Sequence, residues 1–415
     1  MGLQGHQENR KAFRNKNQTR RPISPPQLPR SQRLRQKQKN NQRRTSEKSV
    51  RDHVEGNTTR RRLLRFLKRA AAKAGHQRGL AMKKAPSQEE MMEQVQKLLE
   101  ERGRKALEMA RKTVLEEEIE CEEVREALKY FITEYWHDVA RLALLSLCCE
   151  AVGGDPEVTI HIAIPLSLIS GGIDIHDDII DQSEIKRSRP TVLGKFGKDL
   201  ALLVGDALIF KGLALLHEAA EKGVPPEKIQ VISGIIKRMF FELGDAEALE
   251  LQFRGRIDVT PEEYLQVVRK KAADVEAHTR ISAILGGGSK KEIEALGEYG
   301  RLLGMIIVLG DDFIDMMDLR EVSHRIKKEH LPLPILFALQ NQKIKRKLDS
   351  LLLQKTLTKR GTQRILEITQ EAGGLKLLEN VMRKLAEDSY RIIPNLKHEK
   401  TNLRLLVQSA LPPFK

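Results

Sequence analysis

Two short runs of aspartate have the residue types and the spacing to bind divalent cations. The members are Asp177, Asp178 and Asp181 in the first run, and Asp311, Asp312 and Asp315 in the second. Residues three or four positions apart share one face of a helix, so each run brings its carboxylates together. Oxygen ligands suit Mg2+, which keeps several waters and completes its shell with phosphate oxygens. The runs therefore predict that magnesium ions hold a phosphate-bearing substrate between two helices.

Apolar residues surround both runs, among them Ile179 and Ile180 in the first and Phe313 and Ile314 in the second. Carboxylates in such a setting repel one another and need partners. One run alone would be a weak signal, because solvated helices often carry acidic stripes. Two runs in similar apolar settings are much harder to explain as solvated surface, so we assign all six aspartates as metal ligands.

Basic residues stand close enough to the aspartates in the sequence to bind the oxygens of a diphosphate. Lys186 and Arg187 come within two turns of the first run, and Lys328 follows the second. Lys271 belongs to a third segment, after Tyr264. Any one such residue is more often a solvated surface side chain. Grouped after the acidic runs, they can neutralise a leaving diphosphate, and we expect Lys271 to take part in catalysis.

The segments that position these residues have the pattern of helices. From Ser87, which can form a capping box with Glu90, apolar residues recur at helical spacing as far as Ser409. No strand alternation is visible, and aromatic residues make up only 4% of the chain. We predict one all-α domain over residues 86–415, with roughly ten to thirteen helices. No apolar run reaches the ~18 residues of a membrane span.

Residues 1–85 differ from the rest in composition. Residues 1–84 carry 25 Lys and Arg against four acidic residues, a net charge of +21; the whole chain carries +16, so the remainder carries −5. This basic extension has few apolar residues, and we predict that it is disordered. Contact with an anionic surface and organellar targeting are both open, while no motif indicates specific nucleic-acid binding. The three cysteines form no disulfide framework, which indicates a cytoplasmic setting.

Three stretches together carry a family resemblance. They are His176–Leu208 (HDDIIDQSEIKRSRPTVLGKFGKDLALLVGDAL), Tyr264–Ala273 (YLQVVRKKAA) and Gly310–Leu339 (GDDFIDMMDLREVSHRIKKEHLPLPILFAL). In these motifs the chain resembles the trans-isoprenyl diphosphate synthases, the polyprenyl synthetase family of the class I isoprenoid synthase fold. The resemblance covers about residues 90–400 and its paired aspartate motifs are quite specific.

The resemblance implies an all-α bundle around a central cavity, three Mg2+ ions and a homodimer. It also implies that the enzyme ionises an allylic prenyl diphosphate on the metal clamp. Bulky residues four and five positions before the first aspartate shorten the cavity in family members, and here Ile173 and Gly172 stand there. No aromatic plug is visible there, so by this analogy we expect a long substrate or product, of about C20 or more. For the allylic diphosphate itself we expect about C15–C20.

The pocket for isopentenyl diphosphate, the second substrate of the family, departs from the family pattern. Its Lys-x-x-Arg motif falls at residues 138–141, where Arg141 survives but the lysine is Asp138 and a neighbouring arginine is Val139. The expected histidine before the first run is Ser170. The part that ionises the allylic substrate is therefore complete, while the acceptor part lacks charge. If a second diphosphate binds, we assign Arg141 to it.

Several functions remain open on these residues. The first is a magnesium-dependent (poly)prenyl diphosphate synthase, a prenyltransferase. The second is a terpene cyclase or lyase that no longer uses isopentenyl diphosphate. The third is a non-catalytic regulatory subunit of a synthase, against which the six retained carboxylates argue. A nucleic-acid binder acting through the basic extension is the most distant alternative.

Overall fold

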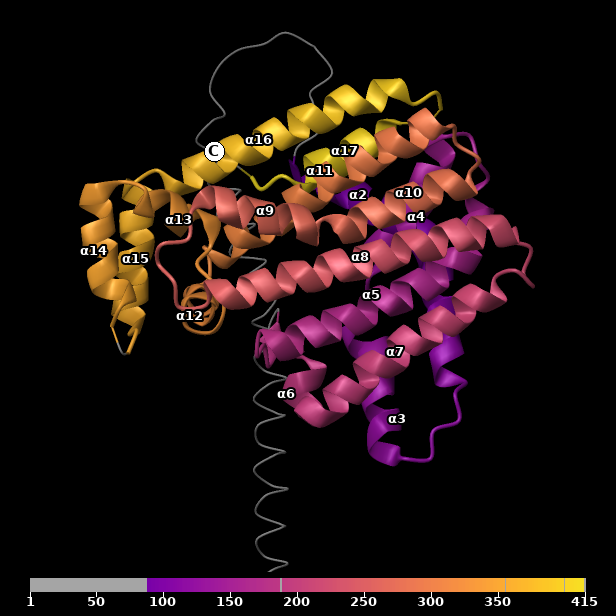
Figure 1. Ribbon diagram of the computed structural model, residues 1–415, viewed down its shortest axis with the longest axis horizontal. Helices are drawn as coiled ribbons and strands as arrows, with labels where there is room; N and C mark the ends of the chain where they lie inside the picture. Colours follow the sequence, from indigo (N-terminus) through magenta and orange to yellow (C-terminus); the bar gives the residue numbers. More distant parts are fainter. Residues whose placement is uncertain (1–87, 187–188, 355, 399, 414–415) are drawn as a thin grey trace, which may run out of the picture. The chain divides into compact units, whose positions relative to one another are not determined.

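The computed structural model describes residues 88–415 except 187–188, 355, 399 and 414–415. Contacts divide the chain into two units, Met1–Ala81 and Met82–Lys415, and all described residues belong to the second (Figure 1). The predicted disordered extension, residues 1–85, lies outside the described residues, and its disorder stays a prediction.

The described residues form sixteen α-helices, more than the ten to thirteen predicted. They are α2 (Gln88–Leu115), α3 (Glu122–Lys129), α4 (Val139–Ala151), α5 (Ile160–Ile180), α6 (Val192–Phe196), α7 (Lys198–Glu218), α8 (Pro226–Phe253), α9 (Pro261–Lys271), α10 (Ala273–Leu285), α11 (Lys290–Asp315), α12 (Leu319–Lys328), α13 (Leu333–Leu339), α14 (Gln342–Leu352), α15 (Lys359–Glu371), α16 (Gly374–Ile392) and α17 (Thr401–Ala410). Short irregular helices η1 (Tyr130–Tyr135), η2 (Pro156–Thr159) and η3 (Ile393–Asn395) complete them. The all-α prediction is confirmed.

The count was too low because single residues divide segments that look continuous in sequence. Gly197, with φ at 86°, separates α6 from α7. Ala272 alone separates α9 from α10. The helical spacing of apolar residues continues on both sides of such a break, so the sequence pattern does not show where one helix ends and the next begins.

Helices α5 and α7 pack closely through glycines. A Cβ added at Gly172 would lie 2.6 Å from the carbonyl oxygen of Gly205, and one at Gly212 would lie 2.6 Å from that of Pro165. Both helices are long and apolar enough to cross a membrane by length and composition alone. That finding corrects the expectation that no such segment exists. In α5, 72% of the apolar window is buried inside the protein, whereas in α7 the share is 39%.

The core consists of two clusters. One contains side chains of α4, α5 and α7, such as Leu145, Leu166 and Leu208. The other surrounds α11 and α16, with Tyr299 and Met382. The C-terminal end of α5 contacts both α12, through His324 and the backbone oxygen of Asp181, and the end of α8, through Arg254 and the backbone oxygen of Ile180.

Local signals fix where the helices of the site begin and end. Capping boxes start α9 and α11: Thr260 pairs with Glu263, and Ser289 with Glu292. At the end of α5 the chain turns back through Gln182, whose φ is +55°.

Beyond this turn lies a two-stranded antiparallel ladder, formed by β1 (Ile185–Lys186) and β2 (Arg189–Pro190). Sequence patterning had shown no strand here, and strands of two residues are too short to alternate visibly. The ladder returns the chain toward the end of α5.

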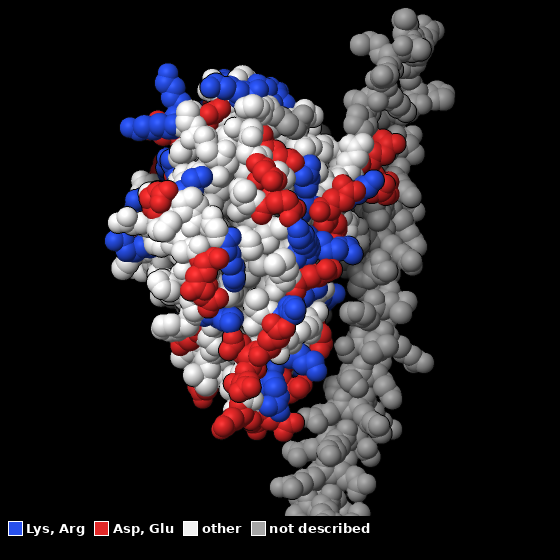
Figure 2. Space-filling view, turned by 90° about the vertical axis from the view of Figure 1, so that its right-hand side faces the viewer, with Lys and Arg blue, Asp and Glu red and all other residues white. Residues whose placement is uncertain are grey.

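Acidic and basic side chains are interspersed over the face of the helical unit in Figure 2. This mixture agrees with the small net charge of the chain after residue 84.

Candidate active site

The first run of aspartates lies at the C-terminal end of α5. Asp177 and Asp178 belong to the last turn, and Asp181 caps the helix. Strand β1 brings Lys186 over this end, with its Nζ 3.1 Å from Asp177 Oδ2 and 2.8 Å from Asp178 Oδ1. Burial raises the pKa of Asp178 to about 6, even though Lys186 lowers it. Lys186 is thus in contact with the first run, as its position in the sequence predicted.

A second lysine reaches the same run from the end of α9. Lys271 Nζ lies 4.0 Å from Asp177 Oδ1, 3.0 Å from Glu247 and 2.5 Å from Glu250. His330 Nε2 approaches Glu250 within 2.9 Å. Burial alone would raise the pKa of Glu250, but Lys271 and His330 lower it to about 2. The glutamate is therefore ionised and holds Lys271 beside the aspartates.

Three carboxylates of this group could share one cation. Oxygens of Asp177, Asp181 and Glu247 all lie within 4.8 Å of one another. Oε2 of Glu247 is buried without a hydrogen-bond partner. Burial and neighbouring negative charges raise the pKa of Asp181 to about 8 and that of Glu247 to about 7. An oxygen-only donor set with an unsatisfied buried oxygen fits a hard divalent cation such as Mg2+.

In the second run, Asp312 is held by protein groups. It is 1% exposed. Its Oδ1 accepts hydrogen bonds from the Tyr264 hydroxyl at 3.1 Å and Arg325 Nη2 at 3.0 Å, and its Oδ2 accepts one from the Leu333 backbone N–H at 3.0 Å. Both oxygens are thus occupied in this structure, and the assignment of Asp312 as a metal ligand stays a prediction.

The other two aspartates of the second run are more accessible. Asp311 lies on the exposed side of α11. Asp315 accepts a hydrogen bond of 2.7 Å from Arg325 Nη1. Burial raises the pKa of Asp315, although Arg325 lowers it. Arg325 therefore holds two members of the second run at once.

Two helices connect the runs. Helix α9 contacts the second run through Tyr264 and the first through Lys271, which are seven residues or roughly 10 Å apart along a helix. Helix α12 carries Arg325 and also His324, whose Nε2 lies 3.2 Å from the backbone oxygen of Asp181. The structure thus brings the two predicted runs into one network of contacts.

The remaining predicted cations differ in position. Lys328 donates a hydrogen bond of 3.0 Å to Gln182 at the end of α5, close to the first run. Arg187 lies outside the described residues. Arg141 lies against the carboxylates of Asp138, Asp174 and Asp274. Its binding of a substrate diphosphate stays a prediction.

Sequence reasoning missed several members of this network. They are Glu247, Glu250, Arg325, Glu329 and His330. Glu247 and Glu250 stand three apart near the end of α8, a pattern that places two acids on one helix face. That spacing is the signal that could have drawn attention to them.

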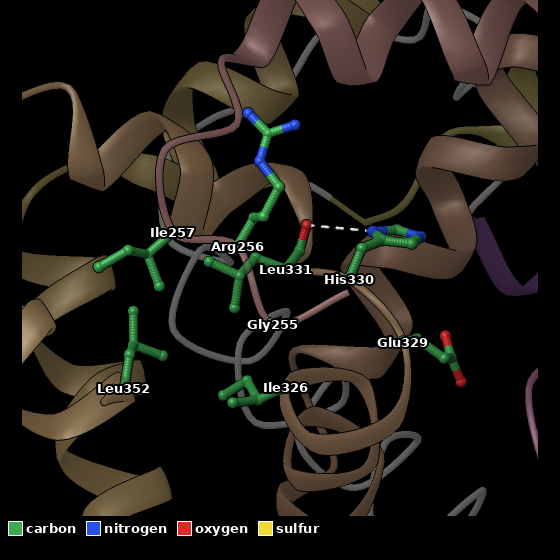
Figure 3. A pocket seen from close by; sticks show the side chains of 8 residues that line it. All are labelled: Gly255, Arg256, Ile257, Ile326, Glu329, His330, Leu331 and Leu352. Carbon is green, nitrogen blue, oxygen red and sulfur yellow. Dashed lines mark hydrogen bonds between the residues drawn. The ribbon is translucent and has the colours of Figure 1, made fainter. Parts of the chain in front are cut away.

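A small pocket borders the network on the side of His330 (Figure 3). Figure 3 shows Glu329 and His330 on one side of it, with Ile257 and Leu352 on the opposite side. The pocket thus has a polar and an apolar wall.

Comparisons with known proteins agree with this geometry. The family model described as Polyprenyl synthetase matches residues 122–369. A short chain isoprenyl diphosphate synthase from Methanothermobacter thermautotrophicus is 36% identical over 217 residues, covering 52% of this chain and 65% of that protein. A geranylgeranyl diphosphate synthase from Methanosarcina mazei is 34% identical over 192 residues, covering 46% and 58%. The chain therefore spans less than two thirds of the length of these curated relatives.

Solved structures share the fold. A polyprenyl synthetase from Streptomyces coelicolor A3(2) superposes with a TM-score of 0.67 at 21% identity, covering 77% of this chain and 100% of that one. The predicted isoprenoid synthase fold is confirmed. Since the family model matches more than half of its length, this chain belongs to the polyprenyl synthetase family.

Proposed function

We propose that this chain is a magnesium-dependent prenyltransferase that ionises an allylic prenyl diphosphate of about C15–C20. The observation that carries the proposal is the group of Asp177, Asp181 and Glu247, whose oxygens lie within 4.8 Å of one another beside two lysines. The curated relatives are named as synthases of isoprenyl and geranylgeranyl diphosphates, which supports the same substrate class.

We assign metal binding to the carboxylates of the site and diphosphate binding to its lysines. The carboxylates of the first run and Glu247 would hold Mg2+, and Asp311 and Asp315 would hold further ions, up to the three that the family resemblance implies. Bound Mg2+ stabilises the charge that develops on a leaving diphosphate. Lys186 and Lys271 already point their ammonium groups at the carboxylates. They would bind diphosphate oxygens once a cation neutralises those carboxylates.

Release of inorganic diphosphate tests the proposal. With Mg2+ and isopentenyl diphosphate as the acceptor, purified protein is expected to release it from geranylgeranyl or farnesyl diphosphate, and chelation by EDTA is expected to stop the release. Isopentenyl diphosphate alone, whose diphosphate is not allylic, serves as the control substrate. Absence of release from every allylic diphosphate of C10–C20 would contradict the proposed function and would favour a non-catalytic subunit.

A cyclase- or lyase-type reaction at the same site is the second candidate. The observation in its favour is the pairing of Arg141 with three carboxylates, which leaves this guanidinium no nitrogen without a partner. Hydrocarbon or alcohol products formed without isopentenyl diphosphate would identify this reaction.

We also propose a homodimer, as the family resemblance implies. Large apolar side chains are exposed on α7, where Phe210 is 72% exposed, and on α8, where Phe241 is 73% exposed. Exposed apolar surface of this kind often marks an interface. Replacing both phenylalanines by aspartate is expected to shift the protein from dimer to monomer in size-exclusion chromatography with light scattering. Leu353→Asp, at another exposed apolar side chain, is the matched control. A variant that stays dimeric would contradict this interface.

A further inference from the structure

The hairpin formed by β1 and β2, which carries Lys186, is too short to hold itself in place. Its strands have two residues each and pair Ile185 with Pro190 and Lys186 with Arg189. An isolated two-stranded hairpin is at best marginally stable in water. The position of Lys186 over the end of α5 therefore depends on contacts between the hairpin and other parts of the chain.

Backbone and hydroxyl bonds close the base of the hairpin. The hydroxyl of the buried Thr191 donates to the backbone oxygen of Ser183 at 2.7 Å, and the backbone N–H of Thr191 donates to that of Glu184 at 3.0 Å. The backbone N–H of Ser183 donates in turn to the backbone oxygen of Asp178 at 2.9 Å. These bonds involve only residues outside the two strands, so they fix the base of the hairpin but not its strands.

The π-helical turn η1 supplies contacts to β2 itself. Tyr130 Oη donates to the backbone oxygen of Pro190 at 2.7 Å. Arg189 Nη1 donates to the backbone oxygen of Glu134 at 3.2 Å. Both residues of β2 are thus held by one turn of π-helix, a conformation that is rare and is frequently found at functional sites.

The phenol of Tyr130 has little freedom to move. Its residue is only 7% exposed, and its ring centroid lies 5.6 Å from that of Phe196. Lys195 Nζ lies 3.5 Å from the centre of the same ring, a favourable cation–π arrangement. Burial raises the pKa of Tyr130, so its hydroxyl stays protonated and donates. The donor that reaches Pro190 is therefore fixed in place.

Pro190 connects this phenol to the candidate metal site. In the ladder Pro190 lies opposite Ile185, the residue before Lys186. Lys186 Nζ then contacts Asp177 at 3.1 Å and Asp178 at 2.8 Å. A lysine side chain has high rotamer entropy, so a strand free to move would leave its ammonium group in many positions. The bond between Tyr130 and Pro190 thus restricts where Lys186 can lie.

We infer that Tyr130 is a positioning residue, whose bond to Pro190 holds Lys186 in the arrangement that binds the diphosphate of the allylic substrate. This inference rests on the proposed function, in which Lys186 binds diphosphate oxygens. Without the bond the hairpin adopts further positions, and the apparent affinity for substrate falls with the population of the competent one. Once substrate is bound, Lys186 is in place, so the loss falls on KM and not on kcat.

Tyr130→Phe tests the inference, because it removes one hydroxyl and keeps the ring. Binding of farnesyl thiolodiphosphate, an allylic analogue that ionises poorly, to the Mg2+-loaded protein is measured by calorimetry. The variant is expected to bind about fivefold more weakly than the wild type, since the net contribution of one hydrogen bond corresponds to a factor of this size. The KM for geranylgeranyl diphosphate is expected to rise by the same factor, while kcat changes by less than about twofold.

A double-mutant cycle separates positioning of Lys186 from a general effect on the fold. Lys186→Ala alone is expected to weaken binding of the analogue. In that background Tyr130→Phe is expected to change the affinity by less than about twofold, because the hydroxyl acts through Lys186. A full fivefold loss from Tyr130→Phe in the Lys186→Ala protein would overturn the inference.

Tyr299→Phe is the matched control. The hydroxyl of Tyr299 is buried and donates to the backbone oxygen of Leu403 at 2.9 Å, a bond of the same type between α11 and α17. Its loss is expected to lower the melting temperature at least as much as Tyr130→Phe does, and to leave the affinity for the analogue unchanged. An equal loss of affinity in both variants would overturn the inference.

The wild-type titration distinguishes failure of the inference from failure of the proposed function. If the wild type binds the analogue and Tyr130→Phe binds it equally well, the inference alone is wrong. If the wild type does not bind the analogue in the presence of Mg2+, the proposed function is wrong and the inference with it.

Discussion

Replacing Asp177 by asparagine is expected to slow diphosphate release from an allylic substrate by about a hundredfold or more. Asp177 contributes to the three-carboxylate group and contacts both Lys186 and Lys271. The asparagine keeps the shape but loses the charge that a divalent cation needs. The measurement is the initial rate at saturating Mg2+, together with the Mg2+ concentration that gives half the maximal rate, which is expected to rise.

The fold should tolerate this change. Lys186 keeps its contact of 2.8 Å with Asp178, and Lys271 keeps its contacts with Glu247 and Glu250. The melting temperature is therefore expected to stay close to that of the wild type. Asp388→Asn, which removes a carboxylate from α16, serves as the control and should leave the rate unchanged. Wild-type activity in Asp177→Asn would contradict the assignment of the first run to the metal.

The fold class and the two aspartate runs were accessible from sequence because both depend on local periodicity. Spacings of three and four residues place carboxylates on one helix face whatever the rest of the chain does. The capping pairs at the starts of α9 and α11 are similarly local. Lys186 and Lys271, which sequence assigned to the diphosphate, both lie near the first run in the structure, and their binding of a diphosphate stays a prediction.

What sequence did not reveal are contacts between distant segments. Glu250 meets Lys271 and His330 only because α8, α9 and the chain after α12 converge, and no spacing rule spans such separations. The same holds for Arg141, whose retention in sequence suggested a role in binding a substrate. Its three aspartate partners come from residues as far away as Asp274. The location in the cell and the state of residues 1–85 stay predictions.

Substitution of Asp312 should mainly lower the stability of the protein, whereas substitution of its neighbour Asp311 should mainly lower the rate of diphosphate release. Asp312→Asn is expected to lower the free energy of unfolding by about 3 kcal/mol or more, because it leaves the buried Arg325 without one of its charge partners. Tyr264 and the backbone N–H of Leu333 would also lose the negative charge of a shared acceptor. Thermal or urea unfolding measures this loss, which should lower the melting temperature by several degrees.

Asp311→Asn removes the same charge from an exposed position on α11. Its stability is expected to stay within about 0.5 kcal/mol of the wild type, since surface substitutions rarely exceed this. Its rate of diphosphate release, by contrast, should fall strongly, because Asp311 is one of the proposed metal ligands and is exposed to solvent on α11. The two variants therefore distinguish the proposed metal-binding role of Asp311 from the structural role of Asp312, which holds α11 in place. A stable Asp312→Asn protein, or an unstable Asp311→Asn protein with normal activity, would reverse these roles.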